Sequence, residues 1–186
     1  SEIEKLIEDI RRRLKKLEDE SRKSVKDARD MLRRVEERSR DSVRKMREEL
    51  ERVEDESRRG DRPKEALEEI IRRIKKKLDE NHKRHHDEIE KIKEELERLN
   101  REHHDRVRRA KEDLDRILEK AAREGLDDEL LKRLEDVVRD VKRKLDELDE
   151  RHTRIVEDVK RRLDDLDREH RKIVEEVKKE LDKLLK

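Results

Sequence analysis

Cysteine, tryptophan, tyrosine and phenylalanine are all absent from this chain of 186 residues, which also has a single proline and two glycines. Without cysteine it has neither disulfides nor thiolate ligands for zinc. Without aromatic rings it offers nucleic-acid bases nothing to stack on, and its 58 basic and 57 acidic residues leave no net basic surface. No apolar run approaches the length of a membrane span, and no signal peptide is recognisable. We therefore expect no nucleic-acid partner and, at neutral pH, no membrane partner.

Charged residues make up 62% of the chain and hydrophobic residues only 28%. So little apolar surface usually predicts disorder, because its burial cannot offset the loss of chain entropy. Here, however, the opposite charges nearly cancel and the apolar residues recur with a helical period. An Ala/Glu/Lys/Leu/Arg/Asp alphabet with that period is typical of long helices and coiled coils.

Two breaks interrupt the helical pattern. At the first, Gly60 suits the left-handed position after a helix, Asp61 suits an N-cap, and Pro63 suits a first helical turn. At the second, Gly125 suits the left-handed position after a helix, and Asp127 suits the N-cap of the next helix. The pattern predicts three helices, at about 2–59, 62–124 and 128–186, within one domain spanning 1–186.

The start of the first helix has a capping signal of its own. Ser1 and Glu4 have the spacing of a capping box, in which each side chain bonds the other's backbone N–H.

An 18-residue repeat runs through the predicted helices. The segment VKRKLDELDERHTRIVED at 141–158 is followed by VKRRLDDLDREHRKIVEE at 159–176. Eighteen residues make about five turns, so the apolar stripe does not drift around the helix and no supercoil is imposed. Each helix has one stripe about 100° wide. With short connections, this predicts an all-α fold: a long, nearly straight antiparallel three-helix bundle running up, down and up.

Polar residues other than the charged ones lie inside these stripes. Near the centre are Ser21, Ser39, His85, His103, His152 and His170. At the edges are Ser24, Ser42, Asn81, His82 and Asn100, and just beyond them are His86 and His104. No Asp, Glu, Lys or Arg is expected to point inward.

The hairpin registers bring these polar residues into two layers, about 27 Å apart. One layer contains Ser21, Ser24, Asn100, His103 and His152, with Ser21 beside His103 and Asn100 facing His152. The other contains Ser39, Ser42, His82, His85 and His170, with Ser39 beside His85 and His82 facing His170. Buried polar groups need partners, so we expect the members of each layer to be hydrogen-bonded to one another.

With its exact repeats, idealised loops, reduced alphabet and layered Ser/His/Asn core, the chain resembles de novo designed helical bundles with buried histidine hydrogen-bond networks. The resemblance implies a synthetic, soluble structural protein without a natural cellular address, suited to recombinant cytoplasmic expression. It also implies a bundle, or a subunit of an assembly, that comes apart in mild acid.

The same conclusion follows from the chemistry of histidine, whose charge normally changes between about pH 5 and 8. A buried neutral imidazole has a lowered pKa, so the stability of the fold falls as the solution is acidified. The ten residues of the two layers are thus predicted to form a pH-sensing network. An alternative is that the networks serve only the specificity of packing.

A second alternative is a metal site. His82, His85 and His86 have helical ligand spacing, and His152 or His170 could add another imidazole. The expected lack of an inward carboxylate and the poor ligand character of Ser argue against it, so we expect no metal and no cofactor.

No catalytic apparatus is expected either. Ser21 beside His103 would need an orienting acid and an oxyanion-binding loop, and neither is apparent. We expect no small-molecule substrate. The near-zero net charge does not oppose self-association, so a monomer and a homo-oligomer or filament both stay open.

Overall fold

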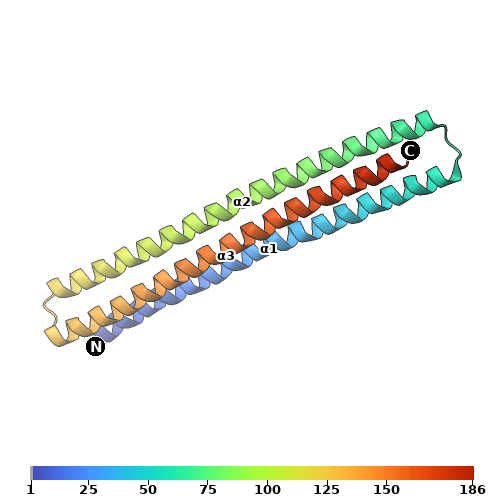
Figure 1. Ribbon diagram of the computed structural model, residues 1–186. Coiled ribbons are helices and arrows are strands. Elements are labelled where there is room, and N and C mark those ends of the chain that lie inside the picture. The colour runs from blue at the N-terminus through green and yellow to red at the C-terminus, as the bar shows by residue number, and fades with distance from the viewer. Residues whose placement is uncertain (1) are drawn as a thin grey trace. The chain divides into compact units, whose positions relative to one another are not determined.

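The computed structural model describes residues 2–186, which form three helices and no strand: α1 (Glu2–Arg59), α2 (Lys64–Arg123) and α3 (Asp128–Lys183). Two short connections join them (Figure 1). The fold is an all-α three-helix bundle. The predicted capping box cannot be assessed, because Ser1 lies outside the described residues.

The two glycine breaks end α1 and α2 as the sequence predicts. Gly60 has a φ of 68° and Gly125 a φ of 74°, values in the left-handed region that residues with a Cβ rarely adopt. Asp127 caps α3: its carbonyl accepts the N–H of Leu131 at 2.8 Å and its carboxylate lies 3.4 Å from the N–H of Glu129. The chain therefore reverses at each glycine.

The start of α2 differs from the prediction. The Pro63 carbonyl accepts the first two bonds, from the N–H groups of Ala66 at 3.1 Å and Leu67 at 3.2 Å, so the helix begins at Lys64. Pro63 therefore occupies the position just before the helix instead of its first turn. The predicted cap, Asp61, lies two residues before Pro63. At the other end of the chain, α3 ends at Lys183, and residues 184–186 continue in a turn.

The chain divides into two compact units, each built from one segment of every helix. Unit 1 comprises residues 1–29 and 95–158, and unit 2 comprises residues 30–94 and 159–186. Within each unit the three segments enclose a core of aliphatic side chains.

The core of unit 1 draws on all three helices. Its buried members are Ile3, Ile7, Ile10, Leu14 and Leu17 of α1, Val107, Leu114 and Ala121 of α2, and Leu134, Val138, Val141 and Leu145 of α3. Ion pairs between helices fix the register: Arg13 pairs with Asp113 at 3.3 Å, and Glu20 with Arg106 at 3.7 Å. Numbers rise on α1 as they fall on α2, so these two segments are antiparallel.

The core of unit 2 is likewise built from all three helices. Its buried members are Met46 and Val53 of α1, Leu67, Ile71, Ile74 and Leu78 of α2, and Val174, Val177 and Leu181 of α3. Lys75 pairs with Asp182 at 3.0 Å, and Asp79 with Lys178 at 2.9 Å. Numbers again run in opposite directions, so α2 and α3 are antiparallel in this unit.

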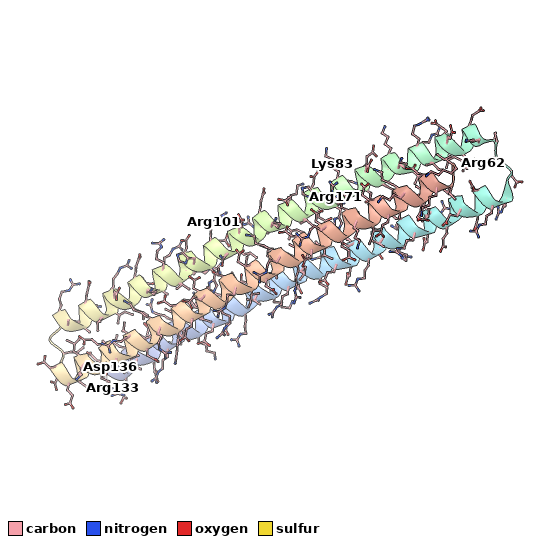
Figure 2. All side chains as sticks on the ribbon, in the orientation of Figure 1. Arg62, Lys83, Arg101, Arg133, Asp136 and Arg171 are labelled. Carbon is pink, nitrogen blue, oxygen red and sulfur yellow. The ribbon has the colours of Figure 1, made fainter. Side chains whose placement is uncertain are left out.

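Charged side chains cover the helix faces that turn away from these cores. Figure 2 shows this for exposed residues on each unit, such as Arg101 and Lys83. Among residues 2–186 no large hydrophobic side chain is exposed. Exposed ion pairs contribute little, so the fold depends chiefly on its buried aliphatic stripes.

The exact position of the stripe on α3 differs slightly from the wheel prediction. Val156 is fully buried, whereas Ile155, expected nearer the centre, is only half-buried. The buried stripe is therefore displaced toward Val156, by less than the angle of about 100° that separates consecutive residues.

Removing a core side chain should cost far more than removing one at the core's edge. Leu145→Ala should lower the free energy of unfolding by about 2–5 kcal/mol, because Leu145 is buried and the surrounding helices cannot collapse into the cavity. Leu148→Ala, on the same helix and only half-buried, is the matched control and should lose roughly half as much. Guanidinium melts followed by circular dichroism measure both, and equal losses would contradict this placement of the core.

Candidate functional site

Each unit buries a cluster of histidines within its aliphatic core, and the two clusters occupy positions 18 residues apart in every helix. We call them the unit 1 network and the unit 2 network. The unit 1 network consists of Ser21, Ser24, Asn100, His103, His104, Asp149, His152 and Thr153. The unit 2 network consists of Ser39, Ser42, Asn81, His82, His85, His86, Asp167 and His170.

His152 is the centre of the unit 1 network and is 1% exposed. Its Nδ1 lies 2.9 Å from Oδ1 of Asn100, an oxygen that also accepts the Thr153 hydroxyl at 3.1 Å. Because an amide oxygen only accepts, Nδ1 of His152 carries the proton. Its Nε2 therefore accepts the Ser24 hydroxyl, 2.8 Å away. These contacts hold His152 as a neutral imidazole between α1 and α2.

His103 of α2 lies flat against His152. The ring centroids are 4.0 Å apart and the planes differ by 5°. Its Nδ1 donates to Oδ1 of Asp149 at 3.1 Å, and the other oxygen of that carboxylate accepts from Nδ1 of His104 at 2.6 Å. Nε2 of His103 is buried and has no hydrogen-bond partner. Asp149 thus joins a buried histidine to an exposed one.

The expectation that no carboxylate points inward is therefore wrong. The side chains of Asp149 and Asp167 are only 16% and 20% exposed, and both reach buried histidines. Each lies three residues before the central histidine of its own network, at the edge of the α3 stripe. Their recurrence at the 18-residue period, one turn before His152 and His170, was the available sequence signal. His104 and His86, predicted to lie just outside the core, are the exposed partners of these two carboxylates.

In the unit 2 network a chain of polar contacts crosses all three helices. Nδ2 of Asn81 donates to Oγ of Ser42 at 2.8 Å, and the same oxygen lies 2.9 Å from Nε2 of His170. Nδ1 of His170 then lies 2.9 Å from Nδ1 of His82. One of these two nitrogens must donate and the other accept, so at least one of the pair is unprotonated there.

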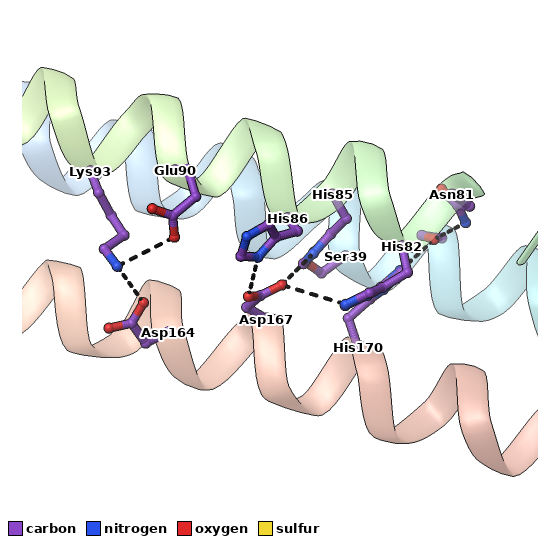
Figure 3. Close-up of polar contacts among 11 residues, drawn as sticks. Ser39, Asn81, His82, His85, His86, Glu90, Lys93, Asp164, Asp167 and His170 are labelled. Carbon is purple, nitrogen blue, oxygen red and sulfur yellow. Dashed lines mark hydrogen bonds and ion pairs between the residues drawn. The ribbon is translucent and has the colours of Figure 1, made fainter. Parts of the chain in front are cut away.

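The remaining members of the unit 2 network gather at Asp167 (Figure 3). Nδ1 of His86 lies 2.7 Å from Oδ2 of Asp167. Oδ1 lies 3.8 Å from Nδ1 of His85 and 3.9 Å from Nε2 of His82. On the other side of the His85 ring, Nε2 is 2.5 Å from Oγ of Ser39. His85 and His170 stack with centroids 4.0 Å apart.

Burial controls the protonation of the central histidines. Desolvation, with a smaller contribution from His103, lowers the pKa of His152 from 6.5 to about 4. Desolvation likewise lowers the pKa of His170 to about 4, aided by His85 and His82. Burial also lowers the pKa values of His82 and His85, although the charge of Asp167 opposes it.

The exposed His86 behaves in the opposite way. Its hydrogen bond to Asp167 raises the pKa of the imidazole above 6.5. Unlike the buried rings, it is stabilised in its charged form.

Three of the predicted pairs are in polar contact, and one lacks the expected hydrogen bond. Asn100 contacts His152, His82 contacts His170, and Ser39 contacts His85. Ser21 is buried, but it makes no hydrogen bond to His103, whose Nε2 is left without a partner. The hydrogen bond expected between Ser21 and His103 is absent; instead, the edge residues Ser24 and Ser42 bond the two central histidines.

The geometry bears on two kinds of chemistry, acyl transfer and metal binding. Ser39, His85 and Asp167 have the order of a nucleophile, base and acid, but Ser39 is 7% exposed and enclosed between helices, so a substrate carbonyl could not reach it. His82, His85 and His170, by contrast, offer ring nitrogens that all lie within 4.8 Å of one another. The arrangement suits proton and metal binding better than acyl transfer.

None of the helices described in residues 2–186 has an apolar stretch long enough to cross a membrane.

Comparison with known proteins supports the fold. No family model matches the chain, and no curated protein matches it. Among solved structures it is similar to one described as a computationally designed three helix bundle, with a TM-score of 0.65 and 16% sequence identity over 99% of this chain and 89% of that chain. At this identity the similarity establishes the three-helix-bundle fold alone.

Ser24 and Ser21 offer a matched test of the unit 1 network, since both are 7% exposed on the same face of α1. Ser24→Ala should lower the free energy of unfolding by about 1–3 kcal/mol at neutral pH, because Nε2 of His152 loses its donor in a buried place. Ser21→Ala removes no hydrogen bond to a histidine and should cost less. Equal losses in guanidinium melts would show that the bond between Ser24 and His152 contributes nothing to stability.

Proposed function

We propose that the chain is a designed structural protein, a three-helix bundle in which buried histidine networks make the stability of the fold depend on pH. The observation that carries this proposal is His152, an imidazole 1% exposed and held by two neutral partners from two other helices. Unit 2 also buries histidines among hydroxyl and amide groups.

Three features support a designed origin. The 18-residue repeat recurs almost unchanged along α3, at 141–158 and 159–176. The polar core residues recur with the same spacing on all three helices, so that each network has a counterpart. The fold is shared with a computationally designed bundle, whereas no family model matches the chain. These features together favour a scaffold without enzymatic activity.

The charges around His152 oppose its protonation. His103 and Arg106 of α2 both lower its pKa, and Asp149 of α3 is the single group that raises it. The partner from α1 is the uncharged Ser24. Because desolvation is larger than any of these charge effects, the ring stays neutral in the folded state.

The direction of the pH effect follows from this lowered pKa. Between about pH 6.5 and about pH 4, the unfolded chain binds a proton at His152 and the folded chain does not. Acid therefore favours the unfolded state, and stability present above pH 6.5 is lost progressively as the pH falls toward 4. Each such histidine removes about 1.4 kcal/mol per pH unit in that interval. A few acting together would remove a large part of a typical domain's stability, about 5–15 kcal/mol.

We extend the proposal to assembly. If copies of the chain associate as a homo-oligomer or filament, loss of the fold in mild acid also dissolves the assembly, since contacts between subunits require folded helices. Particle mass in solution at about pH 8 and about pH 4.5 tests this part. A mass of one chain at both values confines the pH response to the fold.

Replacing His152 separates a pH-responsive network from one that serves packing specificity alone. In His152→Leu, the loss of unfolding free energy between about pH 7 and about pH 5 should be smaller than in the parent by about 2 kcal/mol, because one buried titrating group is gone. Guanidinium melts at both pH values measure the difference, which is independent of how the substitution changes stability at neutral pH.

The control is His104→Leu, which removes an imidazole that is 68% exposed from the same interface of α2 and α3. It should keep most of the parent's acid-induced loss. If His152→Leu loses as much stability between the two pH values as the parent does, the pH-switch reading is wrong and packing specificity is the function of the network.

A further inference from the structure

Three imidazoles converge inside unit 2. His82 and His85 come from α2 and His170 from α3, and all three are at least nine-tenths buried. One ring nitrogen from each lies within 4.8 Å of the others. Nitrogen ligands at such separations can meet at a single ion.

Two atoms of this cluster are left without partners. Nδ1 of His85 and Oδ1 of Asp167 are both buried and make no hydrogen bond, although they lie only 3.8 Å apart. The same carboxylate oxygen is 3.9 Å from Nε2 of His82. A buried lone pair without a partner is unfavourable, and a cation between these atoms would satisfy both. Figure 3 shows Asp167 reaching toward His82 and His85.

We propose that His82, His85, His170 and Asp167 form a binding site for a divalent transition-metal ion such as Zn²⁺. Three imidazole nitrogens and one carboxylate oxygen are ligands that suit Zn²⁺ and Co²⁺ in tetrahedral geometry. With bonds of about 2.0–2.2 Å, ligand atoms of a tetrahedral site lie about 3.4 Å apart. Nδ1 of His82 and Nδ1 of His170 lie 2.9 Å apart, and one nitrogen from each of the three rings lies within 4.8 Å of the others. The rings of His85 and His170 stack with planes 7° apart, so binding requires them to rotate until their in-plane lone pairs meet at one ion.

The outer contacts already have the form that metal-bound histidines require. A ligating histidine usually donates its other ring N–H to an oxygen, which fixes the ring's orientation. If His85 and His170 bind through Nδ1, their Nε2 groups donate to Ser39 at 2.5 Å and to Ser42 at 2.9 Å. The serines that make poor ligands thus serve as the oxygens that orient the ligands.

A route from solvent exists on one side of the site. A surface pocket of about 390 Å³ borders His82, His86 and Asp167. Asp79 and Glu175 also line it and attract a cation, while Lys83 and Arg171 oppose them. The ion can therefore enter beside Asp167 without the helices separating.

Unit 1 supplies an internal comparison. At the position equivalent to His82, 18 residues along α2, it has Asn100, which accepts the hydrogen bond of His152. Its network therefore has two buried imidazoles, His103 and His152, where unit 2 has three. The proposed metal site is in unit 2 and does not depend on the pH response proposed for the unit 1 network.

The test compares the parent with two variants, His82→Asn and Asn100→His. The full chain at about pH 7.5 is titrated with Zn²⁺ by calorimetry and with Co²⁺ by visible absorption, whose intense d–d bands report tetrahedral coordination. The parent should bind one equivalent with such bands. His82→Asn, which copies the residue of unit 1, should lose the bands and at least tenfold in affinity. Asn100→His should add a second equivalent.

Circular dichroism establishes that both variants keep their helices. The added equivalent in Asn100→His tests the site even if His82→Asn fails to fold. Absence of d–d bands in the parent, or tight binding that persists in a folded His82→Asn, would overturn the proposal. Weak binding by surface carboxylates appears equally in all three proteins and is subtracted using His82→Asn.

Discussion

The desolvation of imidazole is the constraint on which both networks depend. A ring placed between three helices loses its contact with water and stays in the core only as a neutral group with its polar atoms partnered. Neutral imidazole donates at one nitrogen and accepts at the other, so its neighbours must be both acceptors and donors. Asn100 and Ser24 meet these requirements for His152 from two different helices. The register of the helices is thereby tied to the protonation state of one ring.

The 18-residue repeat places the same backbone positions in both units, and so single side chains decide how the units differ. Asn100 in unit 1 supplies an amide oxygen to His152, whereas His82 in unit 2 supplies a ring nitrogen to His170. With Asn100, His152 has an uncharged partner at each ring nitrogen. With His82, three imidazoles lie beside a carboxylate, and Nδ1 of His85 and Oδ1 of Asp167 are unpartnered. One residue thus separates the site for which we propose a pH response from the proposed metal site.

Sequence periodicity predicted the helices, the breaks at Gly60 and Gly125, and the grouping of polar residues into two sets, because each depends on position along one helix. It did not predict Asp149 and Asp167 as inward partners. A wheel angle gives the direction of a side chain from its own axis, but not the distance to the next helix. Those carboxylates are short enough to turn from the edge of the α3 stripe into the gap beside α2. The bonding of Ser24 rather than Ser21 to a buried histidine has the same origin, since the two serines lie about one helical turn apart on the same face of α1.

The way the unit 1 network responds to acid follows from which contacts survive protonation. A second proton on His152 would sit at Nε2 and point at Ser24, whose hydroxyl can rotate from donor to acceptor. The bond to Asn100 is unchanged, because Nδ1 donates in both forms. The cost of acid is therefore not a broken hydrogen bond but a charge enclosed beside His103 and Arg106, with only Asp149 to balance it. Such a charge becomes hydrated when α3 moves away from its neighbours and water enters. The backbone bonds within each helix are not involved, so we expect packing between helices to be lost before helicity.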